Sequence, residues 1–157
     1  MILYHASPVP NISVFDAGTH FGTQQSALER SRARKFENRD MYLYTVDLDV
    51  HRPLEIFDEG GSHTTEYLVE VIRQADRKAF SAFAADIFLK TAVQDGEKAA
   101  IKLMIDTMLA QGRYDCLTYL NNTEGDEEDY SYMIFDGKQA RIIACENLQK
   151  PQVAFSL

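Results

Sequence analysis

The sequence predicts an α+β domain, in which helices are segregated from a mostly antiparallel sheet. Two patterns predict this class. Short apolar runs typical of strands occur in the first third of the chain and again in the last third, whereas the middle carries apolar residues at helical spacing. The length of 157 residues and the globular composition, 45% apolar and 25% charged, suit one domain with its own core. We therefore expect a single domain over residues 1–157.

The first third of the chain is expected to hold strands around one helix. Residues 1–5 form an apolar run that a pair of prolines ends, because proline removes a backbone donor. Residues 24–36 place apolar side chains at helical spacing and predict a helix. Residues 41–50 are β-branched and aromatic, which predicts a strong strand, and residues 52–56 continue this strand after a bend.

The middle of the chain is expected to be helical. Residues 64–88 carry apolar side chains at helical spacing, including Phe83 and Ile87, and predict one or two helices with an aromatic stripe facing the core. The next helix is expected to be capped by Asp95, because a short acidic side chain can accept from the first free N–H groups. Gly112 is expected to end it.

The last third returns to strands, which we expect over residues 116–120, 130–135 and 141–145. Cys116 and Cys145 each lie in one of these apolar runs, so we interpret both as buried apolar residues. Two isolated thiols form neither a disulfide framework nor a metal-binding spacing, and the histidines form no ligand pair. We expect no metal site.

The charge of the chain limits its partners. A formal net charge of −8 repels phosphate backbones, which argues against direct nucleic-acid binding and favours a protein partner. No apolar run approaches the roughly 18 residues of a membrane span, and the first residues lack the pattern of a signal peptide. We therefore expect a cytoplasmic protein without membrane contact. The acidic run 124–129 is typical of a solvated loop, although such a run can also imitate nucleic acid.

One basic cluster stands out in this acidic chain. It comprises Arg30, Arg32, Arg34 and Lys35, in the helix expected over residues 24–36. The cluster can attract a pyrophosphate, and a solvated helix face explains it equally well. Both interpretations stay open.

Two short motifs near the N-terminus suit a nucleotide-binding site. The strand over residues 1–5 delivers His5, and a glycine-hinged turn brings His20 and Phe21 nearby. The ring of Phe21 offers a stacking face, and the imidazoles can donate or accept hydrogen bonds near neutral pH. A histidine after an apolar run is also commonly a satisfied structural residue, and this alternative stays open.

A third motif lies between two expected strands. The loop N-N-T-E-G over residues 121–125 places Glu124 at a sheet edge, where a carboxylate can stabilise a developing oxocarbenium ion. The chain contains no G-x-S-x-G elbow and no G-x-x-x-x-G-K-[ST] loop. Serine-based hydrolysis and P-loop phosphoryl transfer therefore have no support.

Five short motifs follow one another along the chain: Y-H-A-S, T-H-F-G-T-x-x-x-A-x-x-R, R-P-L, Y-D-C-L-T-Y-x-N-x-x-E-G and S-Y-M-I-F-D-x-x-Q. Their order and spacing resemble the small ADP-ribosyltransferase domains of phage and mobile-element polyvalent proteins. The resemblance covers residues 2–59 and 111–143 and leaves the helical middle unmatched. It implies an ADP-ribosyltransferase-like split antiparallel sheet core and NAD as substrate. It also implies transfer to a host protein in the bacterial cytoplasm, since some phage proteins of this kind are anti-CRISPR factors that modify a defence complex.

The resemblance also implies roles for single residues. Glu124 corresponds to the catalytic carboxylate, His5 to the histidine that holds the adenosine-side ribose, and Phe21 to the aromatic residue near the nicotinamide. Asn122 stands where arginine-directed enzymes carry Glu or Gln, which leaves the acceptor residue open. The cofactor-binding set that follows is Tyr4, His5, Ala6, Ser7, His20, Phe21, Gly22, Thr23, Arg30 and Asn122.

Two alternative functions fit the same sequence. A non-catalytic inhibitor would use its acidic face to occupy a nucleic-acid-binding site on a partner protein. Such an inhibitor would keep its function after Glu124→Ala and lose it at raised salt. An NAD glycohydrolase would use the site of a transferase with water as the nucleophile.

Overall fold

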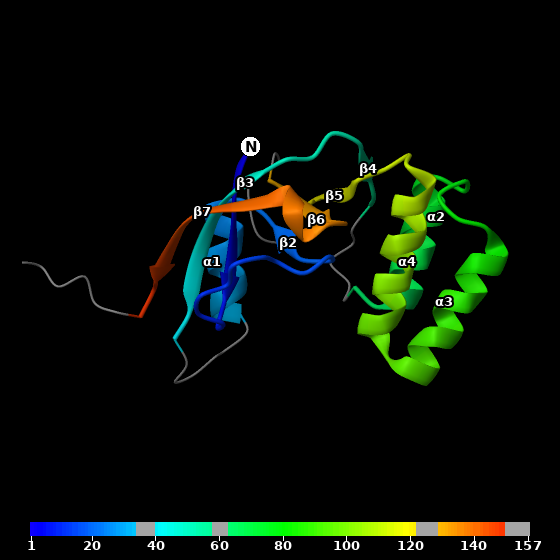
Figure 1. The fold of residues 1–157 in the computed structure, drawn as a ribbon, viewed down its shortest axis with the longest axis horizontal. Coiled ribbons are helices and arrows are strands. Elements are labelled where there is room, and N and C mark those ends of the chain that lie inside the picture. Colours follow the sequence, from blue (N-terminus) through cyan, green and yellow to red (C-terminus); the bar gives the residue numbers. More distant parts are fainter. Residues whose placement is uncertain (34–39, 58–62, 122–128, 150–157) are drawn as a thin grey trace, which may run out of the picture.

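The computed structural model describes residues 1–33, 40–57, 63–121 and 129–149. The strands gather at one end of the molecule, and helices α2, α3 and α4 form the other end (Figure 1). Helix α1 (Gln24–Ala33) lies apart from these three and packs against β1. Helices and mostly antiparallel sheets therefore form a mixed α+β architecture, as the sequence predicts.

Two sheets make up the strand-rich end. The first is antiparallel and has the order β1-β3-β7. The second has the order β2-β6-β5-β4, in which β4 pairs with β5 in parallel and the other pairs are antiparallel. The strands are β1 (Ile2–Ser7), β2 (His20–Phe21), β3 (Tyr42–Leu48), β4 (Pro53–Glu55), β5 (Cys116–Leu120), β6 (Tyr130–Ile134) and β7 (Ala140–Asn147).

A backbone bridge joins the two sheets. Tyr4 N–H donates to the Gly22 carbonyl at 2.8 Å, and Gly22 N–H donates back to the Tyr4 carbonyl at 3.0 Å. Tyr4 lies in the middle of β1, and Gly22 directly follows β2. The bridge therefore places the first strand of one sheet beside the short edge strand of the other.

Strand β4 corrects one expectation. The sequence suggested that residues 52–56 continue the strand before them, but β4 belongs to the other sheet. The bend between the two strands is held by Asp115, whose carboxylate accepts the N–H groups of His51 and Arg52, each at 2.8 Å. Because this carboxylate satisfies the backbone at the bend, the chain can leave one sheet and enter the other.

Three helices build the other end: α2 (Thr65–Ala75), α3 (Ala82–Asp95) and α4 (Glu97–Gln111). Asp95, expected as a cap, is the last residue of α3, and α4 begins after Gly96 without a side-chain cap. The first residue of α4, Glu97, instead accepts from the backbone and hydroxyl of Thr65 at the start of α2. Gly112 ends α4 in a left-handed conformation, φ 69°, as predicted.

The core forms two clusters. One lies between the helices and the second sheet and includes Leu68, Met104 and Leu117. The other includes side chains of both sheets, such as Val46 and Ile134, and extends around Phe21. No helix in the described ranges combines the length and apolar character needed to cross a membrane.

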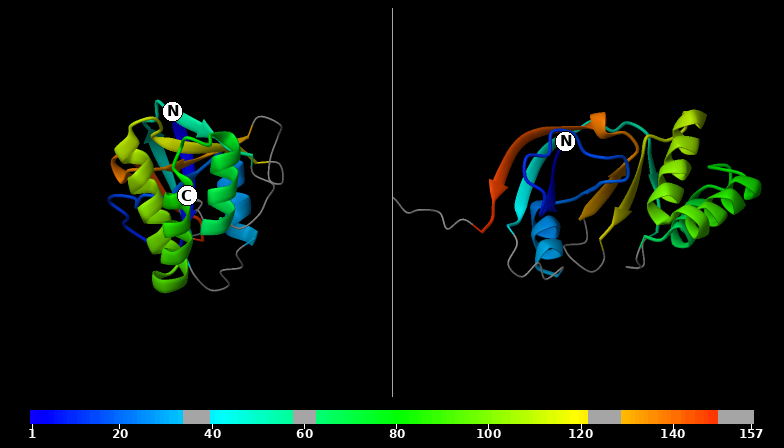
Figure 2. Two further views of the ribbon diagram at one scale, coloured as in Figure 1. Left: turned by 90° about the vertical axis from the view of Figure 1, so that its right-hand side faces the viewer. Right: turned by 60° about the horizontal axis from the view of Figure 1, so that its bottom comes forward.

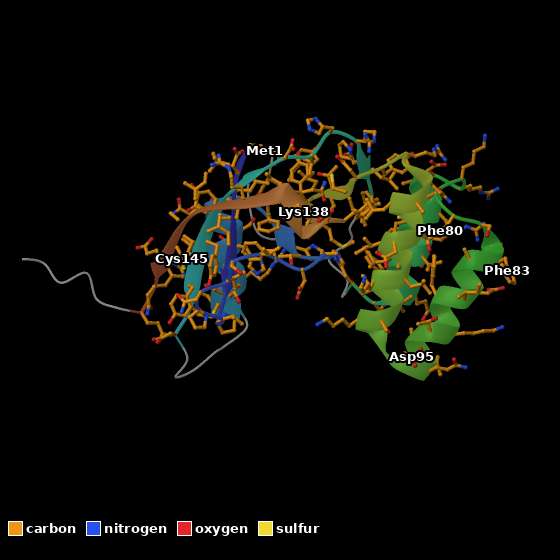
Figure 3. All side chains as sticks on the ribbon, viewed as in Figure 1. Met1, Phe80, Phe83, Asp95, Lys138 and Cys145 are labelled. Atoms are coloured by element: carbon orange, nitrogen blue, oxygen red, sulfur yellow. The ribbon has the colours of Figure 1, made fainter. Side chains whose placement is uncertain are left out.

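Two expectations about burial are wrong. Phe83 and Ile87 were expected in the core, but they are 75% and 39% exposed, because α3 buries its other side, including Phe88. Figure 3 labels Phe83 on the outer side of the helical end. Cys145 was expected to be buried but is exposed, since β7 forms an edge of its sheet (Figure 2, right). Cys116 is buried as predicted, and this burial raises the pKa of its thiol.

Acid is expected to weaken the helical end through Asp76. Its carboxylate accepts from the Tyr114 hydroxyl at 2.7 Å, from the Lys78 backbone at 2.8 Å, and pairs with Arg113 at 2.7 Å. The Tyr114 hydrogen bond is the main cause that lowers the pKa of this carboxyl. A carboxyl with a lowered pKa stabilises the fold above its unfolded pKa, about 4, and loses that contribution as the pH falls through its folded pKa.

The free energy of unfolding of wild type and Asp76→Asn, measured by urea titration between pH 2 and 7, tests this expectation. Wild type should be the more stable protein at pH 7, and the difference should shrink as the pH falls below about 4. A difference that stays constant down to pH 2 would contradict the role of this carboxylate.

Candidate functional site

A cavity of about 230 Å³ lies where β1, the turn around β2, α1 and β6 meet. Its walls come from segments far apart in the sequence, and the bridge between β1 and Gly22 runs along it. Six residues of the predicted cofactor-binding set line it: Tyr4, His5, Ala6, His20, Gly22 and Arg30. Ser26 and Ser131, which the prediction did not include, line it as well.

Two hydroxyl groups lie close to the backbone of Gly22 at the cavity wall. A Cβ atom built on Gly22 would lie 3.0 Å from Ser131 Oγ and 3.2 Å from Ser26 Oγ. These distances are tight for a carbon beside two hydroxyls, so a side chain here would push Ser26 and Ser131 away by a few tenths of an ångström. A glycine lets both serines flank this backbone position without such a shift.

His5 is held in one orientation by the turn opposite it. Its Nδ1 atom lies 2.7 Å from the carbonyl oxygen of His20. Because a carbonyl can only accept, Nδ1 carries the proton and donates it. The ring also contacts Phe15 and Phe21, with centroid distances of 5.4 and 5.6 Å. The imidazole thus enters the cavity wall with a defined tautomer at Nδ1.

His20 connects the cavity to the helical end. Its Nδ1 atom lies 2.7 Å from the hydroxyl of Tyr119, a buried residue of β5. Its ring lies 4.9 Å from the ring of His63, which stacks on Tyr67 of α2 at 5.8 Å. Both cavity histidines therefore have structural contacts, as the structural interpretation predicts, and they also line the cavity; their role in binding stays a prediction.

Three predicted residues lie close to the cavity without lining it. Phe21 is 1% exposed and packs edge to face against Phe15 at 5.0 Å, inside the core. Ser7 is buried and accepts the Val9 N–H at 3.1 Å. Thr23 accepts the Ser26 N–H at the start of α1 and so caps that helix.

Glu124 and Asn122 lie outside the described residues. Their nearest described neighbours are Asn121 and Asp129, and these two are joined by a hydrogen bond of 2.8 Å from the Asn121 N–H to the Asp129 carbonyl. The Asn121 side chain donates to Ser131 Oγ at 2.6 Å, on the cavity wall. The chain on either side of residues 122–128 is therefore fixed beside the cavity.

Asp129 is the residue that the sequence analysis missed most clearly. It is 5% exposed, and its Oδ2 atom accepts the hydroxyl protons of Thr23 and Ser26, both at 3.0 Å. Within the described part of the chain, its Oδ1 atom is buried and has no hydrogen-bond partner. Its place at the end of an acidic run suggested a solvated residue. The only signal in the sequence is that it directly precedes a strand.

These groups suit a polar ligand with anionic and hydroxyl parts. Arg30 supplies a guanidinium that can pair with a phosphate, and the serine hydroxyls and imidazoles supply donors and acceptors. A cavity of about 230 Å³ is smaller than the roughly 300–1,000 Å³ of typical ligand pockets, so it suits one part of a larger nucleotide. The described residues contain no group of three or more metal-ligating side chains.

Comparison with known proteins gives no relative for this chain. No protein-family model matches it, and neither a curated protein nor a solved structure matches it.

Proposed function

We propose that the chain is an NAD-dependent mono-ADP-ribosyltransferase that modifies a protein. One observation carries the proposal. Residues that the motifs assign to NAD binding, drawn from β1, the turn around β2 and α1, line a single cavity. The two sheets that meet at the Tyr4–Gly22 bridge support an ADP-ribosyltransferase-like split sheet as the scaffold.

The residues of the cavity fit the chemical groups of NAD. The Arg30 guanidinium suits the pyrophosphate, and the imidazole of His5 and the hydroxyls of Ser26 and Ser131 suit ribose and amide groups. The missing side chain at Gly22 leaves space between the two serines. When bound, NAD supplies an ADP-ribosyl group, whose bond to nicotinamide breaks during transfer.

Glu124 is the proposed catalytic carboxylate. It follows Asn121 by three residues, and three residues of extended chain span at most about 11 Å. Asn121 donates to Ser131 on the cavity wall, so the covalent chain allows Glu124 to reach the cavity. There its carboxylate would orient the ribose hydroxyls and balance the positive charge that develops as nicotinamide leaves.

The acceptor is proposed to be a protein of a host defence complex. This target class follows from the resemblance to phage and mobile-element domains. The net charge of −8 favours a target with a basic, nucleic-acid-binding surface, because opposite charges accelerate the encounter.

Glu124→Gln is expected to lower protein ADP-ribosylation by about 100-fold or more, because the amide cannot balance positive charge in the transition state. Wild type and the variant are incubated with labelled NAD and a bacterial lysate, and the label on protein bands is followed over time. NAD binding measured by calorimetry should change far less than the rate. Glu127→Gln, in the same acidic run, is the matched control and should keep the wild-type rate.

Other outcomes would separate the alternatives. Free ADP-ribose without labelled protein would favour hydrolysis of NAD. The absence of heat on titrating wild type with NAD would overturn the proposal. An inhibitory effect on a partner that survives Glu124→Ala but is lost at raised salt would favour the non-catalytic acidic inhibitor.

A further inference from the structure

We infer that Asp129 is a positioning residue that acts through Ser26, and that it makes the Ser26 oxygen a hydrogen-bond acceptor at the cavity wall. The inference deepens the proposed function and rests on it where it concerns NAD. It concerns described residues only, which come from the start of α1, the end of β5 and the start of β6.

The hydrogen-bonding capacity of Ser26 decides which way its hydroxyl is polarised. A serine hydroxyl has one proton to donate and two lone pairs to accept with. The Ser26 hydroxyl donates to Asp129 Oδ2 at 3.0 Å, in a buried position, and this commits its only proton. Its oxygen can therefore only accept from other groups, and Ser26 lines the cavity.

Ser131, on the other side of Gly22, still has a proton to donate. Its Oγ accepts a short hydrogen bond of 2.6 Å from Asn121 Nδ2, which leaves its own proton and one lone pair. The same Asn121 nitrogen lies 3.4 Å from Ser26 Oγ, which links the two serines. A hydroxyl that can only accept and a hydroxyl that can still donate thus line the cavity on either side of one glycine. A ligand group that contacts Ser26 must donate to it, whereas Ser131 can donate to a ligand acceptor.

The second carboxylate oxygen argues that Asp129 is there for more than stability. In the described part of the chain Oδ1 is buried without a hydrogen-bond partner, and burying an unsatisfied acceptor destabilises a fold. An acceptor with a single oxygen could satisfy the hydroxyls of Thr23 and Ser26 without this cost. A carboxylate is the strongest acceptor for those two protons, and it fixes both hydroxyl orientations at once.

A double-mutant cycle on NAD affinity tests the coupling. Asp129→Ala and Ser26→Ala are each expected to weaken NAD binding about tenfold, at the upper end of the effect of one lost hydrogen bond. The double variant should bind no more weakly than Ser26→Ala alone, because Asp129 acts through that hydroxyl. Independent losses, which would multiply in the double variant, would overturn the inference.

Two further variants separate positioning from general stability. Asp129→Asn keeps the shape and one acceptor oxygen, so it should recover most of the lost affinity. Asp76→Asn, a carboxyl change in the helical end, should lower the melting temperature without changing NAD affinity. A loss of affinity in Asp76→Asn as large as that in Asp129→Ala would show that reduced stability alone explains the effect.

A measurement without ligand keeps the inference testable if NAD does not bind. The Ser26 hydroxyl proton, when held by Asp129, should exchange slowly and give a resolved proton resonance in the NMR spectrum of wild type. The resonance should persist in Asp76→Asn and disappear in folded Asp129→Ala. Its persistence in Asp129→Ala would overturn the inference, whereas absent NAD binding with this resonance lost as expected would overturn only the proposed function.

Discussion

Gly137→Ala is expected to lower the free energy of unfolding by about 3 kcal/mol, at the upper end of the range for overpacking. A Cβ atom on Gly137 would lie 1.9 Å from the carbonyl oxygen of Phe15 and 3.1 Å from Val14 Cγ1. The first of these is a backbone atom, so a side-chain rotation cannot relieve the clash. The loop before β2 would have to move, and Phe15 belongs to the core between the sheets.

Thermal unfolding checks this expectation. For a chain of this size the loss corresponds to a fall in the melting temperature of about 10 °C. Gly112→Ala is the matched control, because Gly112 has a left-handed φ of 69° but no atom within 4 Å of a built Cβ. Only the conformational cost of about 1–2 kcal/mol applies there. A melting temperature for Gly137→Ala at or above that of Gly112→Ala would contradict the steric explanation.

Phe21→Ala is expected to destabilise the fold by about 3–5 kcal/mol, as for other buried aromatic residues. Phe21 is 1% exposed, and its ring packs edge to face against Phe15 and beside His5. Truncation would leave a cavity in the core between the two sheets and remove these ring contacts. Urea unfolding of wild type and variant gives the difference directly.

Phe21→Leu separates a core role from ligand stacking. Leucine keeps most of the apolar volume, so this variant should be much more stable than Phe21→Ala. If Phe21 acts only in the core, Phe21→Leu should bind NAD with wild-type affinity. A large loss of NAD affinity in the folded variant would show that the aromatic ring itself contacts the ligand.

Most of the elements could be predicted because their signals are local. The apolar runs and helical spacing locate the helices and strands to within a few residues, and Gly112 marks the end of α4. The errors concern partners distant in sequence. Spacing places Phe83 and Ile87 on one side of α3, but it does not show which side of this helix the rest of the protein covers. The place of β4 depends on Asp115, 63 positions beyond Arg52.

The lining of the cavity could be predicted in part, for a similar reason. The motifs identify His5, His20 and Arg30, because these residues lie in short segments with recognisable spacing. Asp129 was missed because its hydroxyl partner Ser26 lies 103 positions away and its neighbours in sequence are acidic. Composition describes a run of charges as a whole and cannot show that the fold buries Asp129.

The bridge between Tyr4 and Gly22 implies that the two sheets respond to a ligand as a unit. Both residues line the cavity, and the two hydrogen bonds between their backbones oppose sliding of one sheet past the other. A ligand bound against this bridge would stabilise both hydrogen bonds, so deuterium uptake at the amides of Tyr4 and Gly22 would slow together. Ligand affinity and the rigidity of the strand-rich end would then depend on the same pair of hydrogen bonds.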